Sequence, residues 1–179
     1  MNYIKSIFSN NCWGGCILHK CGVEFRSPTV NLFTDADSYI KFLKNFRYYV
    51  KKDIVFDDNE SNYYGYIVGH IEGIKFHFMH YNSQYEVSSS WKRRSERIPD
   101  NNDDILFEIC DRDGFSEKTL CDFANLPYKN KIGFLKKGRF NTDSHNIFFE
   151  VESNEDCSPP GSVLADITYD IFKKNYKIE

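Results

Sequence analysis

Short β-prone runs alternate along this chain with segments that have the apolar periodicity of helices, and several of the runs end in polar clusters. The runs "YIKSIF" (residues 3–8) and "ILFEIC" (residues 105–110) have the length and composition of buried strands. Strands that alternate with helices build largely parallel sheets, and ligands bind outside the carboxyl ends of such strands. The sequence therefore predicts an α/β fold: a single domain over residues 1–179, with three layers, a largely parallel sheet and a ligand site at the carboxyl ends of its strands.

The other elements are predicted from apolar spacing, capping residues and turn residues. The most strongly marked helix covers residues 34–50, with Thr34 or Asp35 as its N-cap. We expect further helices over residues 14–22, 83–98, 116–125 and 170–179, strands over residues 63–71, 74–79, 131–135 and 146–151, and a loop over the polar residues 57–62.

Composition excludes several classes of protein. The 41% of hydrophobic residues is enough for one core, and 23 Lys+Arg against 26 Asp+Glu gives no basic excess for a nucleic-acid partner. The N-terminus lacks the apolar region of a signal peptide, and no run approaches the ~20 apolar residues of a membrane span. We expect a cytoplasmic protein without a transmembrane segment, and the sequence leaves its oligomeric state open.

The six cysteines contain no CxxC pair, which weighs against a zinc ribbon or an iron-sulfur cluster. In a chain that is not exported they are predicted to be reduced thiols. The sequence assigns no cofactor and no set of metal ligands.

Four polar clusters follow predicted strands or precede predicted helices. They are Ser9-Asn10-Asn11-Cys12, Thr34-Asp35, His80-Tyr81-Asn82 and Asp111-Arg112-Asp113-Gly114. If the strands are parallel, their carboxyl ends meet at one edge of the sheet, so all four clusters are predicted to lie there.

The stretch "SNNCWGG" combines a thiol, two amides and a glycine pair where a strand is followed by a helix. A helix N-terminus stabilises a thiolate, so Cys12 is a candidate nucleophile or a reactive substrate-contacting thiol; the alternative is a cysteine packed under the turn. Asn10 and Asn11 could bind a ligand through their amides or stabilise the loop as an Asx turn.

The sequence Asp111-Arg112-Asp113 resembles the DxD motif with which nucleotide-sugar glycosyltransferases hold a divalent cation, but it is also compatible with a turn. His80 follows a predicted strand and is a candidate acid or base, whereas a single histidine at this position can equally be structural.

Arg94 shares one face of the predicted helix 83–98 with Val87, Trp91 and Ile98. An inward guanidinium needs an anion, so we expect either a ligand or a carboxylate of the protein beside it, with Arg97 one turn further on.

Several motifs, in this order and spacing, resemble the bacterial domain-of-unknown-function 1919 family, whose members are often labelled exopolysaccharide biosynthesis proteins. They are "SNNCWGG", "SPTVNLF", "YIKFLKN", "HYNS...W.RR..RI", "RDG" and "LPYKNK". The resemblance makes residues 1–138 a family-like core and residues 139–179 a C-terminal extension. It implies an α/β fold and a place among enzymes that build or modify surface glycans.

Carried over position by position, the resemblance marks residues that largely coincide with the polar clusters. They are Asn10, Asn11, Cys12, Trp13, Ser27, Pro28, His80, Tyr81, Trp91, Arg94, Arg97, Arg112, Asp113 and Lys131. The resemblance includes Asp111 less firmly than Arg112 and Asp113, which weighs against the metal-binding interpretation.

Two functions remain open from the sequence. The first is a cytoplasmic transferase of surface or exopolysaccharide biosynthesis, acting on a sugar with an activated-sugar or acyl donor. His80, Asp113 and Cys12 are its candidate catalytic residues, and the other marked residues apart from Pro28 are predicted to bind substrate. The second is a non-catalytic binding or interaction module of the same pathway.

Overall fold

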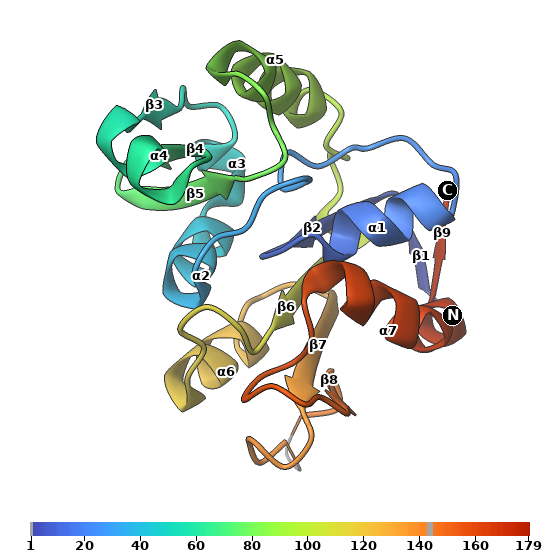
Figure 1. Cartoon of the computed structure of the whole chain (residues 1–179). Helices are drawn as coiled ribbons and strands as arrows, with labels where there is room; N and C mark the ends of the chain where they lie inside the picture. Colours follow the sequence, from blue (N-terminus) through green and yellow to red (C-terminus); the bar gives the residue numbers. More distant parts are fainter. Residues whose placement is uncertain (1, 143–144) are drawn as a thin grey trace.

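The computed structural model of the protein describes residues 2–142 and 145–179 and has a four-stranded parallel sheet at its centre (Figure 1). Its order is β2 (Ser6–Ser9), β6 (Ile105–Cys110), β7 (Asn130–Lys136), β8 (Phe148–Val151). Residues 1, 143 and 144 lie outside the described part; the last two belong to the predicted extension 139–179. Because β2, β6, β7 and β8 all run in one direction, their carboxyl ends share an edge.

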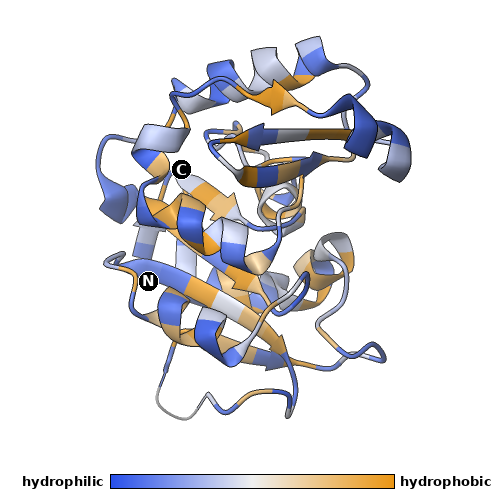
Figure 2. Ribbon diagram, turned by 90° about the vertical axis from the view of Figure 1, so that its left-hand side faces the viewer, coloured by the Kyte–Doolittle hydropathy of each residue, from blue (hydrophilic) through white to orange (hydrophobic). Residues whose placement is uncertain are grey.

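Helices cover both faces of this sheet. The helices α1 (Trp13–Lys20) and α7 (Gly161–Asn175) pack on one face, and α2 (Ala36–Lys44) and α6 (Glu117–Ala124) pack on the other. Alternate strand residues enter the two cores, since Phe8 and Phe107 belong to the α2 side and Ile7 and Leu106 to the α1 side. Hydrophobic residues accordingly run along the central strands in Figure 2. The predicted three-layer α/β fold is confirmed.

A second, antiparallel unit is inserted between β2 and β6. It contains β3 (Val55–Phe56), β4 (Ile67–Ile71) and β5 (Ile74–Phe78), with α3 (Phe46–Tyr49), α4 (Asp58–Tyr64) and α5 (Gln84–Ser95) around them. Phe42 of α2 joins this unit to the main core because its ring packs edge-on against Phe76 of β5 at 5.6 Å.

The chain ends pair with each other at the margin of the fold. Strand β1 (Asn2–Ile4) runs parallel to β9 (Tyr176–Ile178), and the short 3-10 helix η1 (Asn102–Asp104) precedes β6. Among the described residues, no helix is both long and apolar enough to cross a membrane.

The predicted elements are mostly confirmed, with two corrections of substance. The expected loop 57–62 is helix α4, which Asp57 caps by accepting from the Glu60 amide at 2.9 Å and which Gly65 ends at φ +75°. The expected helix 34–50 is interrupted at Asn45, whose φ of −149° is not helical.

Smaller corrections concern the ends of elements. The strand 3–8 bends at Lys5, residues 63–66 precede β4 instead of belonging to it, and the last helix gives way to β9 at Tyr176.

Candidate functional site

A cleft of about 910 Å³ opens at the carboxyl ends of β2 and β6. Five residues predicted from the sequence line it: Asn11, Cys12, His80, Arg112 and Asp113. They come from segments far apart in the chain. The cleft is therefore the candidate site.

Backbone hydrogen bonds bring the strand-end clusters together. The amide of Thr34 donates to the Asn10 carbonyl at 3.0 Å, and the amide of Ala36 donates to the Asp113 carbonyl at 2.9 Å. The remaining cluster, His80-Tyr81-Asn82, reaches the cleft in a way that the sequence did not predict, because His80 follows an antiparallel strand of the inserted unit. A two-way backbone bridge between Phe33 and His77 holds the end of that strand beside the loop, at 2.9 and 3.0 Å.

Two residues of the cleft wall have left-handed backbones. Asn31 has φ +65° and Asp113 has φ +52°, whereas the third such non-glycine residue of the described chain, Glu72, lies in the β4–β5 turn. Such conformations are unfavourable for residues with side chains and concentrate at functional sites. At Asp113 the conformation is held by the hydrogen bond from Ala36.

Asp113 has the electrostatic character of a general base. Asp113 is an exposed residue of the cleft wall, but partial desolvation raises the pKa of its carboxyl and the neighbouring Asp35 raises it further, while Arg112 acts in the opposite direction. A carboxylate with a raised pKa is a better proton acceptor than an ordinary aspartate.

Arg112 reaches the cleft while it is anchored on one side. Its Nη1 donates to Glu155 Oε2 and to the Ser158 carbonyl, both at 2.7 Å. Guanidinium has five N–H donors, so its other nitrogens are available for an anion in the cleft.

Two helices direct their N-termini at the cleft. Their N-cap residues, Cys12 for α1 and Pro160 for α7, make no side-chain cap bond, and neither first turn contains an acidic residue. By contrast, α2, α4, α5 and α6 each have a capping side chain and an acid in the first turn. One first-turn amide of α1, that of Trp13, is met by Asn11 Oδ1, and the partial positive charge of the remaining amides at the two ends acts on the cleft.

Gly161 allows the two helix ends to touch. A Cβ at this position would lie 2.6 Å from Asn11 Oδ1 and 2.8 Å from the Trp13 amide.

The predicted reactivity of Cys12 is not supported. Cys12 is the N-cap of α1, as the sequence indicated, but burial and then the nearby Cys16 raise the pKa of its thiol to about 11. Cys12 is consequently a protonated thiol near neutral pH and a poor nucleophile. All six cysteines are free thiols.

The metal-binding interpretation of Asp111-Arg112-Asp113 is wrong for Asp111. This residue is buried; its Oδ1 accepts from the Ser158 amide at 2.7 Å, and its Oδ2 accepts from the Lys136 amide at 3.1 Å and from Arg139 at 3.0 Å. With both oxygens engaged by donors, Asp111 holds the segment that forms one wall of the cleft.

The side-chain oxygens of the two asparagines in "SNNC" are engaged within the protein, whereas Asn10 Nδ2 is buried without a hydrogen-bond partner. Asn10 is buried, and its Oδ1 accepts from the Cys110 amide of β6 at 3.1 Å and from Asn11 Nδ2 at 3.1 Å. Asn11 does line the cleft, but its Oδ1 accepts from the Trp13 amide at 2.6 Å. The Asx-turn alternative therefore fits Asn11, and Asn10 connects β2 to β6 and does not face the cleft.

Four other marked residues are structural. Trp13 is buried against Phe134 and donates to Thr168 at 2.8 Å, and Trp91 packs on Phe76. Ser27, which precedes the buried Pro28, shares a hydrogen bond with Thr29. Lys131 donates to carbonyls at the end of α6, those of Phe123, Ala124 and Leu126. None of the four lines the cleft.

The inward orientation of Arg94 is confirmed, but its predicted anionic partner is not found among the described residues. Arg94 is 7% exposed, donates to the Tyr81 hydroxyl at 2.6 Å and to the Val30 carbonyl at 3.3 Å, and stacks on the Phe25 ring. Since Phe25 lines the cleft, Arg94 and Tyr81 support the wall from behind.

Arg97 instead forms a surface ion pair with Glu24 at 3.0 Å and does not line the cleft.

The sequence did not predict two residues of the cleft wall or the buried carboxyl group of Glu108. The wall residues Lys20 and Asp166, paired at 2.7 Å, come from α1 and α7, whose contact is not evident in the sequence. Glu108 lies fully buried in β6, and burial raises the pKa of its carboxyl to about 8 although Ser9 donates to it. A signal for Glu108 existed: it is the one charged residue in "ILFEIC".

A second cavity, of about 730 Å³, lies between α5 and the segment 47–54 and includes Trp91. It contains none of the strand-end clusters. The chemistry of the described chain therefore points to the cleft at the sheet edge.

Comparison with known proteins gives the family. The pattern of the family described as "Domain of unknown function (DUF1919)" matches residues 2–164. This chain belongs to the DUF1919 family. An "Uncharacterized protein" of Haemophilus influenzae is 35% identical to it over 136 residues, which are 76% of this chain and 64% of that relative. The chain thus spans less than two thirds of the length of the relative, and the resemblance seen in the sequence motifs is confirmed.

Proposed function

We propose that this DUF1919 protein is a cytoplasmic transferase of surface or exopolysaccharide biosynthesis, which moves a sugar from a phosphate-linked donor to a sugar acceptor. One observation carries the proposal: a single cleft combines Asp113, a base with a raised pKa, with Arg112 and two helix N-termini. The first group suits removal of a proton, and the others suit a phosphate leaving group.

Asp113 accepts the proton of an acceptor hydroxyl, and the hydroxyl oxygen forms a bond to the anomeric carbon of the donor sugar. The bond from that carbon to the phosphate oxygen breaks, and the phosphate leaves with the electron pair. Arg112 and the N-termini of α1 and α7 offset the charge that develops on the leaving group.

The opposite wall of the cleft suits the acceptor. Phe33 and Met79 line it, and Phe33 stacks on His77 at a ring distance of 4.3 Å. Burial lowers the pKa of His77, so this wall is apolar and uncharged at neutral pH. Such a wall packs against the carbon-bound face of a sugar ring, while the exposed His80 at its edge is placed for contact with a hydroxyl.

The test is a binding and turnover screen of purified protein with nucleotide-sugars, acyl-coenzyme A donors and free sugars, with and without Mn²⁺. We expect a nucleotide-sugar to bind, Arg112→Met to weaken its binding, and Asp113→Asn to bind it without turnover. Arg97→Met and Asp170→Asn are the matched controls, because both remove a charge outside the cleft.

Other outcomes decide between the remaining functions. Turnover with an acyl donor and with no nucleotide-sugar would show that the protein transfers an acyl group instead of a sugar. Sugar binding that survives loss of Asp113 and His80, with no turnover of any donor, would favour the non-catalytic module. Absence of all binding would overturn the proposal.

A further inference from the structure

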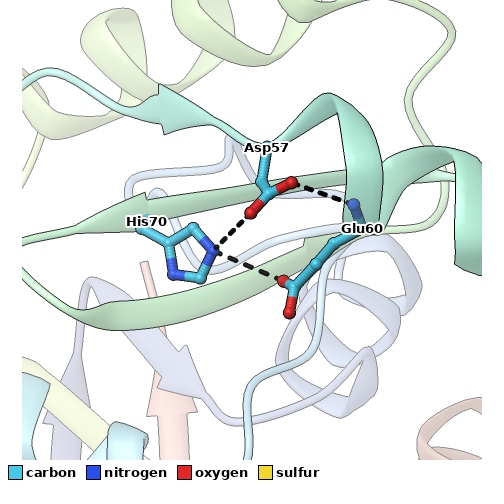
Figure 3. A group of neighbouring side chains, drawn as sticks. All are labelled: Asp57, Glu60 and His70. Atoms are coloured by element: carbon cyan, nitrogen blue, oxygen red, sulfur yellow. Dashed lines mark hydrogen bonds and ion pairs between the residues drawn. The ribbon is translucent and has the colours of Figure 1, made fainter.

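A group of three potential metal ligands lies in the inserted unit, away from the cleft (Figure 3). Asp57 immediately precedes α4, Glu60 lies in its first turn, and His70 lies on β4. Each offers one ligand atom, and the three atoms lie within 4.8 Å of one another.

The spacing of His70 and Glu60 is that of two ligands around an ion, and Asp57 lies a few tenths of an ångström further out. His70 Nε2 lies 3.4 Å from Glu60 Oε2 and 3.8 Å from Asp57 Oδ2. Good hydrogen bonds are shorter, about 2.7–3.2 Å, and one N–H cannot be directed well at two carboxylates. Ligand atoms placed about 2.0–2.1 Å from a tetrahedral ion are about 3.3–3.4 Å apart.

An independent observation concerns the second oxygen of Glu60. Its Oε2 is screened from solvent and has no hydrogen-bond partner, although Oε1 pairs with Lys75 at 2.5 Å. A buried carboxylate oxygen without a donor is costly. An ion between Oε2 and His70 would satisfy it. The two carboxylates together balance the charge of a divalent ion, while Lys75 stays paired with Glu60 Oε1.

The Asp57 carboxylate is also directed at His70. Its Oδ1 accepts from the Glu60 amide at 2.9 Å as the helix cap, which directs Oδ2 at His70 (Figure 3). The Glu60 amide thus holds the Asp57 carboxylate in position, as hydrogen-bond partners of metal ligands do in known metal sites.

We propose that Asp57, Glu60 and His70 bind a divalent transition-metal ion. One imidazole nitrogen with two carboxylate oxygens suits Zn²⁺ or Mn²⁺, with water in the remaining positions. The ion stabilises the attachment of α4, a helix that buries none of its own side chains. The site is separate from the cleft, and its test does not depend on the proposed transferase.

The test adds Mn²⁺, and separately Zn²⁺, to chelator-treated protein and measures amide hydrogen exchange and calorimetric binding. Mn²⁺ is the main probe because it is a poor match for thiols, which are ligands for Zn²⁺. We expect binding of one ion per chain and slower exchange over residues 57–71. Glu60→Gln should weaken binding by more than about 10-fold, whereas Glu117→Gln, in the first turn of α6, should leave it unchanged.

Circular dichroism and hydrogen exchange in chelator show whether helix α4 still forms in the Glu60→Gln variant. If it does not, the His70→Gln variant is used in place of Glu60→Gln. The proposal is overturned if neither ion slows exchange over residues 57–71, or if the variant that retains α4 binds Mn²⁺ as the parent does.

Discussion

The parallel-sheet core and the inserted antiparallel unit use carboxylates in opposite ways. Glu108 and Asp111 of the core are buried. Asp111 accepts from Ser158, Lys136 and Arg139, whereas Glu108 accepts from Ser9 through Oε2 and has a buried Oε1 without a donor. Glu60 of the insertion has a side chain 31% exposed and pairs with a lysine that is 30% exposed. Electrostatic interactions grow as water is excluded, so the same functional group controls stability in one region and only local order in the other.

The largest expected effect is the pH dependence caused by Glu108. Its pKa is raised from 4.5 to about 8 in the folded protein, so between these values the unfolded chain releases a proton that the folded chain retains. Stability therefore falls as pH rises through this window, by on the order of 5 kcal/mol in total. Glu108→Gln removes this contribution, and urea unfolding at pH 5, 6.5 and 8 measures the difference.

We expect the stability of Glu108→Gln relative to the parent to rise steadily across that series. If the unfolding free energies of the two proteins changed with pH in the same way, Glu108 would be ionised in the folded protein. Burial of carboxylates would then not distinguish the core from the insertion.

A smaller loss is expected for Asp111→Ala. The change leaves the buried amides of Ser158 and Lys136 without an acceptor, at a cost of about 3 kcal/mol in the free energy of unfolding. Because Asp111 also holds one wall of the cleft, ligand binding should weaken in the same variant. Asp170→Asn, which is highly exposed, is the control for both measurements. An unchanged urea midpoint would contradict the structural role assigned to Asp111.

The sequence predicted the core better than the insertion, for a physical reason. Strand β6 is a short, almost continuous apolar run, and helices α2 and α6 have apolar residues at helical spacing; burial of those residues determines the structure. Helix α4 buries no side chain, so it has no apolar period to detect. Its only local signals are the cap Asp57 and the terminal Gly65.

The candidate site was predictable only in part. The positions of Cys12 and Asp113 follow from the rule that parallel strands share an edge, and the structure brings both to the cleft. Whether a polar residue faces the cleft or the interior depends on distant partners: Asn10 is turned inward by the Cys110 amide, 100 residues away. The wall from α7 likewise depends on a contact between helices at opposite ends of the chain.

Arg94 of α5 is a buried cation of the inserted unit, and no carboxylate partner is found for it among the described residues. Arg94→Met loses hydrogen bonds to Tyr81 and Val30, but Tyr81 retains its own bond to the Val30 carbonyl at 2.9 Å. We expect a loss of about 1–2 kcal/mol in urea unfolding, less than the 3–5 kcal/mol typical of a broken buried ion pair. Arg97→Met is the exposed control. A loss in the larger range would show that a carboxylate does meet Arg94.

The smallest expected effect is in the insertion, where Lys75→Met removes the ion pair with Glu60. The side chains of the pair are 30% and 31% exposed, so solvent screens the interaction in part and the urea midpoint of the whole protein should change little. Helix α4 has no buried side chain to hold it, and loss of a polar attachment should therefore appear as local opening. Hydrogen exchange in chelator should become faster over residues 58–64 and stay unchanged over β6. Lys137→Met, which removes another exposed pair at 2.6 Å, should leave both segments unchanged. A loss of global stability comparable to that of Asp111→Ala would contradict the comparison, since it would mean that the insertion, too, depends on its charges for folding.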